Sequence, residues 1–468
     1  MESERMNFTL STEPIHTSSA QPAAPRPLSC SIVRTPAEFA ALETPWKALF
    51  QSTARPVPFL AWEWVTTWWK HFGKAAKLFV ILAKDDAGRI VGIAPLQIAT
   101  RRAFGIFPVR SLEFIGYRGS SVCADHLDFM TASGAPHVPE DAVTQPTWLC
   151  DPTRTVSEAL LEAVFAARKE WDCIELADLS EESALPSLLN DQARRRKFRL
   201  AEGAGQVCPC VPLAPSWTEL LKIVKEKKRS AIKWRRKKLS QAYPTQFQIF
   251  ADPAQVDAAL DTLARLHTLS RQRKHETGNF YRADYQAFHR DVARAMARAG
   301  YLYIAQMDCD GRPVASTYGF HVGSVLFDYQ KGYDPAYSRD GVGSVLTGMV
   351  IEDAIERLHA QELDFLRGTE EYKYFWATRD RKTRTILLWS AGVMARLHQG
   401  EFDLRRALAP VKRKGLDSWA RITAPKPAKK PEAAAPQPAV GAAPENPTSA
   451  PAPETAATRS ETPNPPAE

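Results

Sequence analysis

A glycine-punctuated loop carries the strongest chemical pattern in the sequence. The run Ser338-Arg339-Asp340-Gly341-Val342-Gly343-Ser344 leads into residues 342–358, where apolar side chains recur at helical spacing. A helix start offers unpaired backbone N–H groups and the positive end of the helix dipole, and glycines let an anionic pyrophosphate approach the backbone. That chemistry suits coenzyme A, with the contacts predicted on Ser338, Arg339, Gly341, Val342, Gly343 and Ser344. The alternative is that the two glycines only turn the chain into the helix.

The elements around this loop follow a definite order. Residues 301–307, 313–321 and 325–331 are predicted to form three consecutive antiparallel strands ahead of the loop. A short strand over residues 363–366 follows the helix, and a second candidate helix comes after it. That candidate helix contains Tyr372, Tyr374, Phe375 and Trp376.

Two stretches of the chain share a hairpin pattern, which raises the possibility of an internal repeat. Residues 78–98 and 302–322 each consist of an apolar strand-like run, a tight turn and a second such run. The turns, residues 85–89 and 308–312, both place Asp and Gly where a hairpin needs unusual backbone angles. The alternative is that two such hairpins arose by chance.

The densest positive charge lies in a predicted helix over residues 216–241. It begins with the capping box Ser216-x-x-Glu219 and carries ten Lys or Arg against two Glu. Four readings stay open: a solvated face, a grip on cofactor phosphates, contact with an acidic acceptor, and RNA binding. Only one aromatic residue, Trp234, lies among the cations, and this is weak support for RNA binding because base stacking needs aromatic side chains.

A tryptophan-rich segment, residues 62–69, has the spacing of an amphipathic helix. Core packing is the favoured role for its Trp side chains, and a sugar-stacking platform is the alternative.

The run Asp125-His126-Leu127-Asp128 has metal-capable side chains. Alternation along a strand would place His126 and Asp128 on one face, but the sequence shows no third ligand. We therefore predict no metal site.

The glycine loop resembles that of the GNAT acetyltransferase superfamily, which reads Gln or Arg, two residues, Gly, one residue, then Gly or Ala. Gly341 and Gly343 fit, whereas Ser338 stands at the Gln/Arg position, with Arg339 next to it as a candidate for the missing cation. Three longer motifs, over roughly residues 30–400, resemble the CelD-type acetyltransferases of cellulose and exopolysaccharide synthesis, relatives of the Fem-type peptidyltransferases. These motifs are Pro58-Phe59-Leu60-Ala61-Trp62-Glu63-Trp64 with Trp68-Trp69, Arg229-Ser230-Ala231-Ile232-Lys233-Trp234-Arg235-Arg236-Lys237-Lys238-Leu239, and Asp364-Phe365-Leu366-Arg367-Gly368-Thr369-Glu370-Glu371-Tyr372-Lys373.

The resemblance implies an α/β (α+β) fold of two tandem GNAT-like units with mixed central sheets. The expected units are residues 29–205, which lack a glycine loop, and residues 206–423, which hold the basic helix and the cofactor loop 338–344. Residues 1–28 and 424–468 have the Ser, Thr, Pro and Ala-rich composition of a disordered leader and tail.

The resemblance also implies a chemistry. An acceptor amine or hydroxyl would attack the thioester of acetyl-CoA or another acyl-CoA, and a backbone N–H on the strand before the loop would stabilise the oxyanion. By position, Tyr372 or Tyr374 would be the acid, and Asp328 or Glu370 the base. Each also has a plainer role, as a core aromatic, a strand-edge charge or a helix N-terminal carboxylate.

Composition limits the other function classes. The N-terminus has no apolar signal region, no run of about 18 apolar residues follows, and the seven cysteines show no repeated spacing, so a cytoplasmic protein with reduced, buried thiols is expected. The formal charge of +8 points to an anionic ligand or polymer.

The expected partner is a small-molecule or glycan acceptor, with nucleic acid less favoured, and nothing in the sequence gives the oligomeric state. The competing functions are a Fem-like aminoacyl-tRNA-dependent transferase, which the glycine loop disfavours, and a non-catalytic binder of an anionic polymer.

Overall fold

The computed structural model describes residues 28–117, 122–133 and 152–423. The predicted tail, residues 424–468, lies outside these ranges, as does the predicted leader apart from its last residue. No described helix is both long and apolar enough to cross a membrane.

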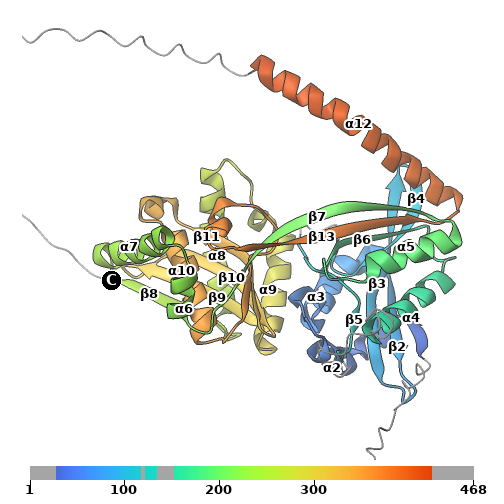
Figure 1. Ribbon diagram of the computed structural model, residues 1–468, viewed down its shortest axis with the longest axis horizontal. Coiled ribbons are helices and arrows are strands. Elements are labelled where there is room, and N and C mark those ends of the chain that lie inside the picture. The colour runs from blue at the N-terminus through green and yellow to red at the C-terminus, as the bar shows by residue number, and fades with distance from the viewer. Residues whose placement is uncertain (1–27, 118–121, 134–151, 424–468) are drawn as a thin grey trace, which may run out of the picture. The chain divides into compact units, whose positions relative to one another are not determined.

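The described strands form one mixed sheet of thirteen strands (Figure 1). Their order is β1-β2-β3-β4-β6-β13-β7-β12-β11-β10-β9-β8, and β5 pairs with β3 off this path. The first six strands are β1 (Ser29–Val33), β2 (Ala76–Lys84), β3 (Ile90–Ala103), β4 (Phe107–Phe114), β5 (Met130–Thr131) and β6 (Cys173–Leu179). The others are β7 (Arg199–Pro212), β8 (Thr245–Ile249), β9 (Leu302–Cys309), β10 (Arg312–Val322), β11 (Val325–Tyr333), β12 (Glu362–Asp364) and β13 (Arg379–Trp389).

Twelve α-helices accompany the sheet in the described ranges. Before β7 these are α1 (Pro36–Ala40), α2 (Glu43–Ser52), α3 (Trp62–Phe72), α4 (Pro152–Ala166) and α5 (Leu185–Arg196). After β7 they are α6 (Trp217–Ile223), α7 (Glu226–Ala242), α8 (Val256–Arg273), α9 (Ala283–Arg298), α10 (Val342–Glu356), α11 (Glu371–Tyr374) and α12 (Val393–Thr423).

The long strands β7 and β13 join the two halves of the sheet. They run antiparallel from Arg379 opposite Cys210 to Trp389 opposite Arg199 (Figure 1). On their other edges β13 pairs with β6, and β7 pairs with β12. A strand from late in the chain therefore completes the half built from its beginning, and the predicted boundary between residues 205 and 206 falls inside β7. The described residues up to Ala407 form a single compact unit.

The predicted strands, glycine loop and helix after the first half are confirmed. β9, β10 and β11 form the antiparallel meander, α10 follows the loop, and β12 comes next. Both predicted hairpins also form, β2 with β3 and β9 with β10. The candidate helix after β12 is a single turn, α11, and β12 ends two residues before Leu366, whose φ is +53°.

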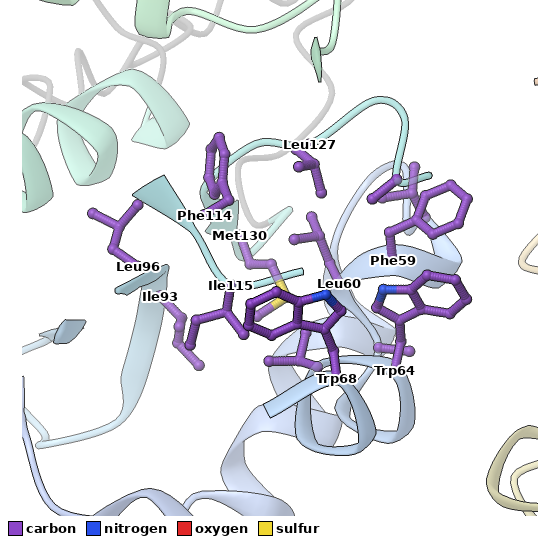
Figure 2. Packing of buried hydrophobic residues seen from close by; sticks show 14 of the residues in the cluster. Phe59, Leu60, Trp64, Trp68, Ile93, Leu96, Phe114, Ile115, Leu127 and Met130 are labelled. Atoms are coloured by element: carbon purple, nitrogen blue, oxygen red, sulfur yellow. The ribbon is translucent and has the colours of Figure 1, made fainter. Parts of the chain in front are cut away.

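The tryptophan-rich segment forms α3 and is part of the core, as predicted. The Trp64 side chain is fully buried, with its ring centroid 4.9 Å from that of Phe59 (Figure 2). It also meets Phe288 on α9 and Phe320 on β10 at 5.3 and 5.8 Å. These aromatic contacts tie the first half of the sheet to the second.

The basic segment is not the single helix that the sequence predicted. It breaks into α6 and α7, because Val224 and Lys225 have extended backbone with ψ near 132° and 138°. Ser216 caps α6 by accepting a hydrogen bond from the Glu219 N–H. The break has a packing reason: Leu220 of α6 and Leu239 of α7 both reach the apolar cluster formed around α10.

The cysteine prediction holds in part. The six described cysteines form no disulfide bond with one another, and four of them are buried, but Cys30 is exposed and Cys123 is half-buried.

Candidate active site

The two strands nearest the glycine loop separate and open a cleft in the sheet. β11 pairs in parallel with β12 only from Val325 to Phe327, although β11 continues to Tyr333. A register shift against β10 leaves Tyr329 as an extra residue between Asp328 and Gln330. This bulge needs Gly319 opposite it, since a Cβ there would lie 2.0 Å from the Phe327 carbonyl oxygen.

A cavity of about 790 Å³ occupies this opening. That volume lies within the range of small-molecule sites. Its walls come from the second part of β11, the start of α10, the segment between β12 and α11, and the end of α8. The first half of the chain contributes Cys123, Asp125 and Gln206.

The start of α10 supplies two free donors to the cavity wall. Gly341 caps the helix with φ +69°, a conformation that favours glycine, and its carbonyl accepts from the Ser344 and Val345 N–H groups. In the described part of the chain the N–H groups of Val342 and Gly343 donate to nothing. Gly343 does not have a positive φ, and a Cβ there would lie 3.6 Å from the Tyr333 ring, in ordinary contact. The site therefore fits an anion beside residues 342–344.

Asp328 lines the cavity, but both of its oxygens are engaged. Thr317 Oγ1 donates to Oδ1 at 2.5 Å, and Lys331 Nζ lies 2.5 Å from Oδ2. Lys331 also donates to Thr347 Oγ1 on α10 and lies over the Tyr372 ring at 5.3 Å. The Asp328–Lys331 pair thus links β11 to α10 and to Tyr372.

Glu370 also lines the cavity, and it is paired with a buried lysine. Lys373 Nζ is 3.0 Å from Glu370 Oε2 and donates to the carbonyl oxygens of Leu366, Arg367 and Gly368. Burial acts to raise the pKa of Glu370, but the Lys373 ammonium and a backbone hydrogen bond hold it below its usual value. Glu370 is therefore a carboxylate at neutral pH. Lys373 stabilises the segment before it through its hydrogen bonds to residues 366–368.

Tyr372 faces the same cavity, whereas two other predicted site residues do not. Burial, with the Asp328 and Glu370 carboxylates nearby, raises the pKa of Tyr372 well above its usual value, so its hydroxyl stays protonated. Tyr374 instead points at Asp380, donating to Oδ2 at 3.3 Å, and Arg339 is exposed outside the lining.

The sequence reasoning missed an arginine that joins the two halves at the cavity. Arg367 binds Asp125 Oδ1 at 2.7 Å and Asp178 Oδ2 at 2.8 Å, and it donates to the Ala124 carbonyl. Arg367 lies inside the CelD-like motif at residues 364–373, and Asp125 lies inside the metal-capable run. One signal in the sequence could have indicated this contact: Asp125 has no lysine or arginine as a partner of opposite charge within its own run.

The run from Asp125 to Asp128 is not a strand, which corrects that prediction. His126 has φ +59°, and the carboxylates on either side of it reach different partners. His126 Nε2 lies 3.1 Å from Asp364 Oδ2, and Asp128 accepts from Ser183 Oγ at 2.9 Å. Burial acts to lower the pKa of His126, but Asp364 raises it above its usual value. Within residues 28–117, 122–133 and 152–423, no three His, Cys, Asp or Glu side chains gather as metal ligands.

Residues 226–374, from the start of α7 to the end of α11, match the family model of the Acetyltransferase (GNAT) domain. This part of the chain is therefore a GNAT domain by similarity; it contains the glycine loop and supplies most of the cavity wall, and Cys123, Asp125 and Gln206 complete that wall from outside it. No curated protein matches the chain.

Solved structures resemble the chain in fold. FemX is 12% identical, with 74% of this chain and 95% of FemX covered and a TM-score of 0.50. A conserved protein of unknown function from Bacteroides thetaiotaomicron is 12% identical, covering 77% of this chain and 100% of that protein, with a TM-score of 0.47. A tandem GNAT protein from the clavulanic acid biosynthesis pathway is 10% identical, covering 78% and 100%, with a TM-score of 0.39. The long mixed sheet is therefore of the FemX kind.

Proposed function

We propose that this protein is an acyl-CoA-dependent acyltransferase that moves an acyl group, most simply acetyl, to an amine or hydroxyl. One observation carries the proposal: the two unpaired N–H groups at the start of α10 and the protonated Tyr372 hydroxyl border one cavity. An anion-binding helix end and a proton donor are the two parts that transfer from a phosphate-bearing thioester requires.

The donor would lie along the opening between β11 and β12. The N–H groups of Val342 and Gly343, with Ser344 beside them, would hold the pyrophosphate, and the unpaired edge of β11 beyond Phe327 would hold the chain leading to the thioester. Ser338 lines the cavity but has no charge to offer, so the helix end carries most of this contact.

The residues around the cavity suit direct attack by the acceptor. The thioester supplies an electrophilic carbonyl and a thiolate leaving group. Glu370 would take the proton that the acceptor loses, and Tyr372 would give its proton to the departing sulfur. A backbone N–H near the bulge at Tyr329 would donate to the carbonyl oxygen as its charge grows. Asp328 is the weaker choice for the base because Lys331 and Thr317 already hold it.

The acceptor would bind on the side of the cavity where the first half of the chain forms the wall. Cys123, Asp125 and Gln206 form that wall, and Arg367 holds it to the second half. With the motifs that resemble CelD-type enzymes, this arrangement supports a small-molecule or glycan acceptor, in exopolysaccharide or envelope metabolism.

Calorimetry and thermal shift with four ligands test this proposal. We expect acetyl-CoA, or a longer acyl-CoA, to bind and to raise the melting temperature, because a ligand selective for the folded state stabilises it. Free coenzyme A should bind too, and bulk tRNA should compete poorly. An absence of binding by every coenzyme A derivative would overturn the proposal.

A second candidate is an aminoacyl-tRNA-dependent transferase of the Fem type. The observation that favours it is the position of α7, whose Arg235 lies beside Gly341 at the cofactor loop. Tight, salt-dependent binding of tRNA without binding of acyl-CoA would select it. If tRNA and other polyanions bound alike and no transfer followed, the protein would be a non-catalytic binder of anionic polymers.

A further inference from the structure

The turn between β3 and β4 presents large apolar side chains to solvent. Phe104, Ile106 and Phe107 are 44%, 67% and 38% exposed, although they fall within four consecutive residues. The turn is tight, with φ +52° at Phe104 and +75° at Gly105, and Ala103 pairs with Phe107 across it. A positive φ is uncommon for phenylalanine and strains the backbone. The surrounding turn must stabilise this conformation, in which the Phe104 side chain is exposed.

Other apolar side chains of the same hairpin are buried. Its own Ala103 and Val109 are fully buried against Trp389, with Phe402 of α12 packed on the same cluster. Figure 1 shows β4 next to the first turns of α12. The Glu401 carboxylate there accepts a hydrogen bond from the Phe104 backbone N–H. One turn along α12, Leu404 is 50% exposed and extends the apolar surface.

Exposed arginines occur on both β3 and α12. Arg102 is exposed, donates to the Ile106 carbonyl at 3.2 Å and, in the described part of the chain, has no carboxylate partner. Arg406 is likewise exposed, and no carboxylate among the described residues pairs with it. The nearby carboxylates of α12 are both paired, Glu401 with Arg405 and Asp403 with Arg199. The β3–β4 turn therefore combines exposed apolar side chains with the exposed cation of Arg102, and α12 carries a second exposed arginine, Arg406.

We propose that the β3–β4 tip, with Leu404, is a docking surface for a membrane that carries anionic lipids. Apolar side chains on a projecting turn can enter the boundary between headgroups and acyl chains, and arginines around them can bind lipid phosphates. A protein partner would have to supply a complementary hollow for the tip, whereas a bilayer needs no such fit. The patch contains no cavity-lining residue, so docking leaves the cavity open, and the inference does not depend on the proposed acyltransferase activity.

Co-sedimentation with vesicles tests this inference on the full chain. We expect binding to vesicles of phosphatidylcholine with phosphatidylglycerol, weaker binding to phosphatidylcholine alone, and loss of binding as salt rises. Phe104→Ser with Ile106→Ser should lower the partition coefficient at least about tenfold, since each side chain loses its apolar transfer. Ile223→Ser, at a 75% exposed residue of α6, is the matched control and should bind like the wild type.

Two further variants keep the test decisive. Arg102→Gln with Arg406→Gln should flatten the salt dependence while leaving the circular dichroism spectrum unchanged. If the double tip variant does not fold, Ile106→Ser alone should still lower the partition coefficient about fivefold.

Three results would overturn the inference. The first is that the wild type does not co-sediment with anionic vesicles. The second is that the folded tip variant binds as well as the wild type. The third is that the protein forms a concentration-dependent dimer that the tip variant does not form. The last result would assign the tip to a second copy of this chain.

Discussion

The side chain of Arg235 lies beside Gly341: a Cβ on that glycine would be 3.6 Å from Arg235 Cδ and 3.9 Å from Nε. The guanidinium is 5.6 Å from the centroid of the Phe375 ring, and no carboxylate pairs with it among the described residues. Its neighbours on α7 differ, since Arg236 pairs with Glu352 and Lys238 with Asp340. α7 therefore places a cation that has no described carboxylate partner at the loop where Ser338 stands in the Gln or Arg position of the GNAT pattern.

Arg235→Gln should weaken acyl-CoA binding about tenfold and reduce its salt dependence, because a charge-assisted contact with a phosphate is lost. Calorimetry at two salt concentrations measures both effects. Lys237→Gln removes an equal charge from an exposed site on the same helix and should change affinity less than about twofold. Equal affinity and equal salt slope in the two variants would mean that α7 is only a solvated face.

Arg367→Ala should lower the free energy of unfolding by about 3 to 5 kcal/mol, because it leaves Asp125 and Asp178 without their shared cation. Denaturation in urea measures the change. Arg384→Ala provides the control, since that arginine is 48% exposed and reaches Glu202 at 3.3 Å, so its loss should cost less than about 1 kcal/mol. A similar cost for both variants would show that Arg367 does not hold the halves together.

Part of the fold and of the site could be predicted from the sequence, and part could not. The glycine loop and α10 were predictable because a left-handed cap at Gly341 and apolar helical spacing are local properties. The same holds for the β9–β10–β11 meander. The bond between Arg367 and Asp125 spans 242 residues, and only the pairing of distant strands brings them together.

The sequence could not reveal how the two halves share their sheet. β13 follows the GNAT domain in the chain but pairs with β6 of the first half. Alternation along β13 indicates a strand and carries no information on its neighbours. The break at Val224 was equally hidden, since its cause is the packing of Leu220 and Leu239 on α10.

Tyr372→Phe should lower kcat about a hundredfold while leaving the Kd for acyl-CoA within about twofold, because it removes a proton donor and keeps the ring. Steady-state kinetics with calorimetry separates the two effects. Tyr374→Phe should be nearly neutral, since that hydroxyl points at Asp380. An equal loss in both variants would argue against Tyr372 as the acid.

The pH profile of the wild type gives a second check on these roles. Since the pKa of Tyr372 is raised well above its usual value, we expect the proposed acid to stay protonated through pH 10 and to produce no alkaline loss below that value. Since the pKa of Glu370 is lowered, an acid-side loss due to this base should appear only below the usual glutamate range, about pH 4.

Asp128→Asn should stabilise the protein at pH 8 and not at pH 4. Burial raises the pKa of Asp128 to about 7 despite hydrogen bonds from Ser183 and Phe129. Between the unfolded value near 4 and about 7, the folded state binds the extra proton, so this group lowers stability as pH rises through that window and keeps the penalty above it. Asn can still accept from Ser183. The expected gain in Tm at pH 8 is at least about 2 °C, and a gain of equal size at pH 4 would contradict the assignment.

Gly343→Asp separates cofactor binding from folding. The φ of Gly343 is not positive, and a Cβ there only touches the Tyr333 ring at 3.6 Å, so a side chain fits without strain. Asp is also favourable in the first turn of a helix, where it meets the positive end of the dipole. Circular dichroism should therefore show a folded protein with a melting temperature near that of the wild type.

Binding of acyl-CoA to Gly343→Asp should nevertheless fall at least about a hundredfold. A carboxylate at this position would lie against the pyrophosphate, and two unit charges about 4 Å apart at an effective dielectric near 20 repel by roughly 4 kcal/mol before screening. Gly343→Ala is the control, because the GNAT loop pattern permits Ala there, and it should bind nearly normally. Calorimetry on both variants decides between a cofactor on α10 and one elsewhere. A folded Asp variant that binds acyl-CoA like the wild type would remove the α10 terminus from the site, because no carboxylate could share that space with a bound pyrophosphate at unchanged affinity.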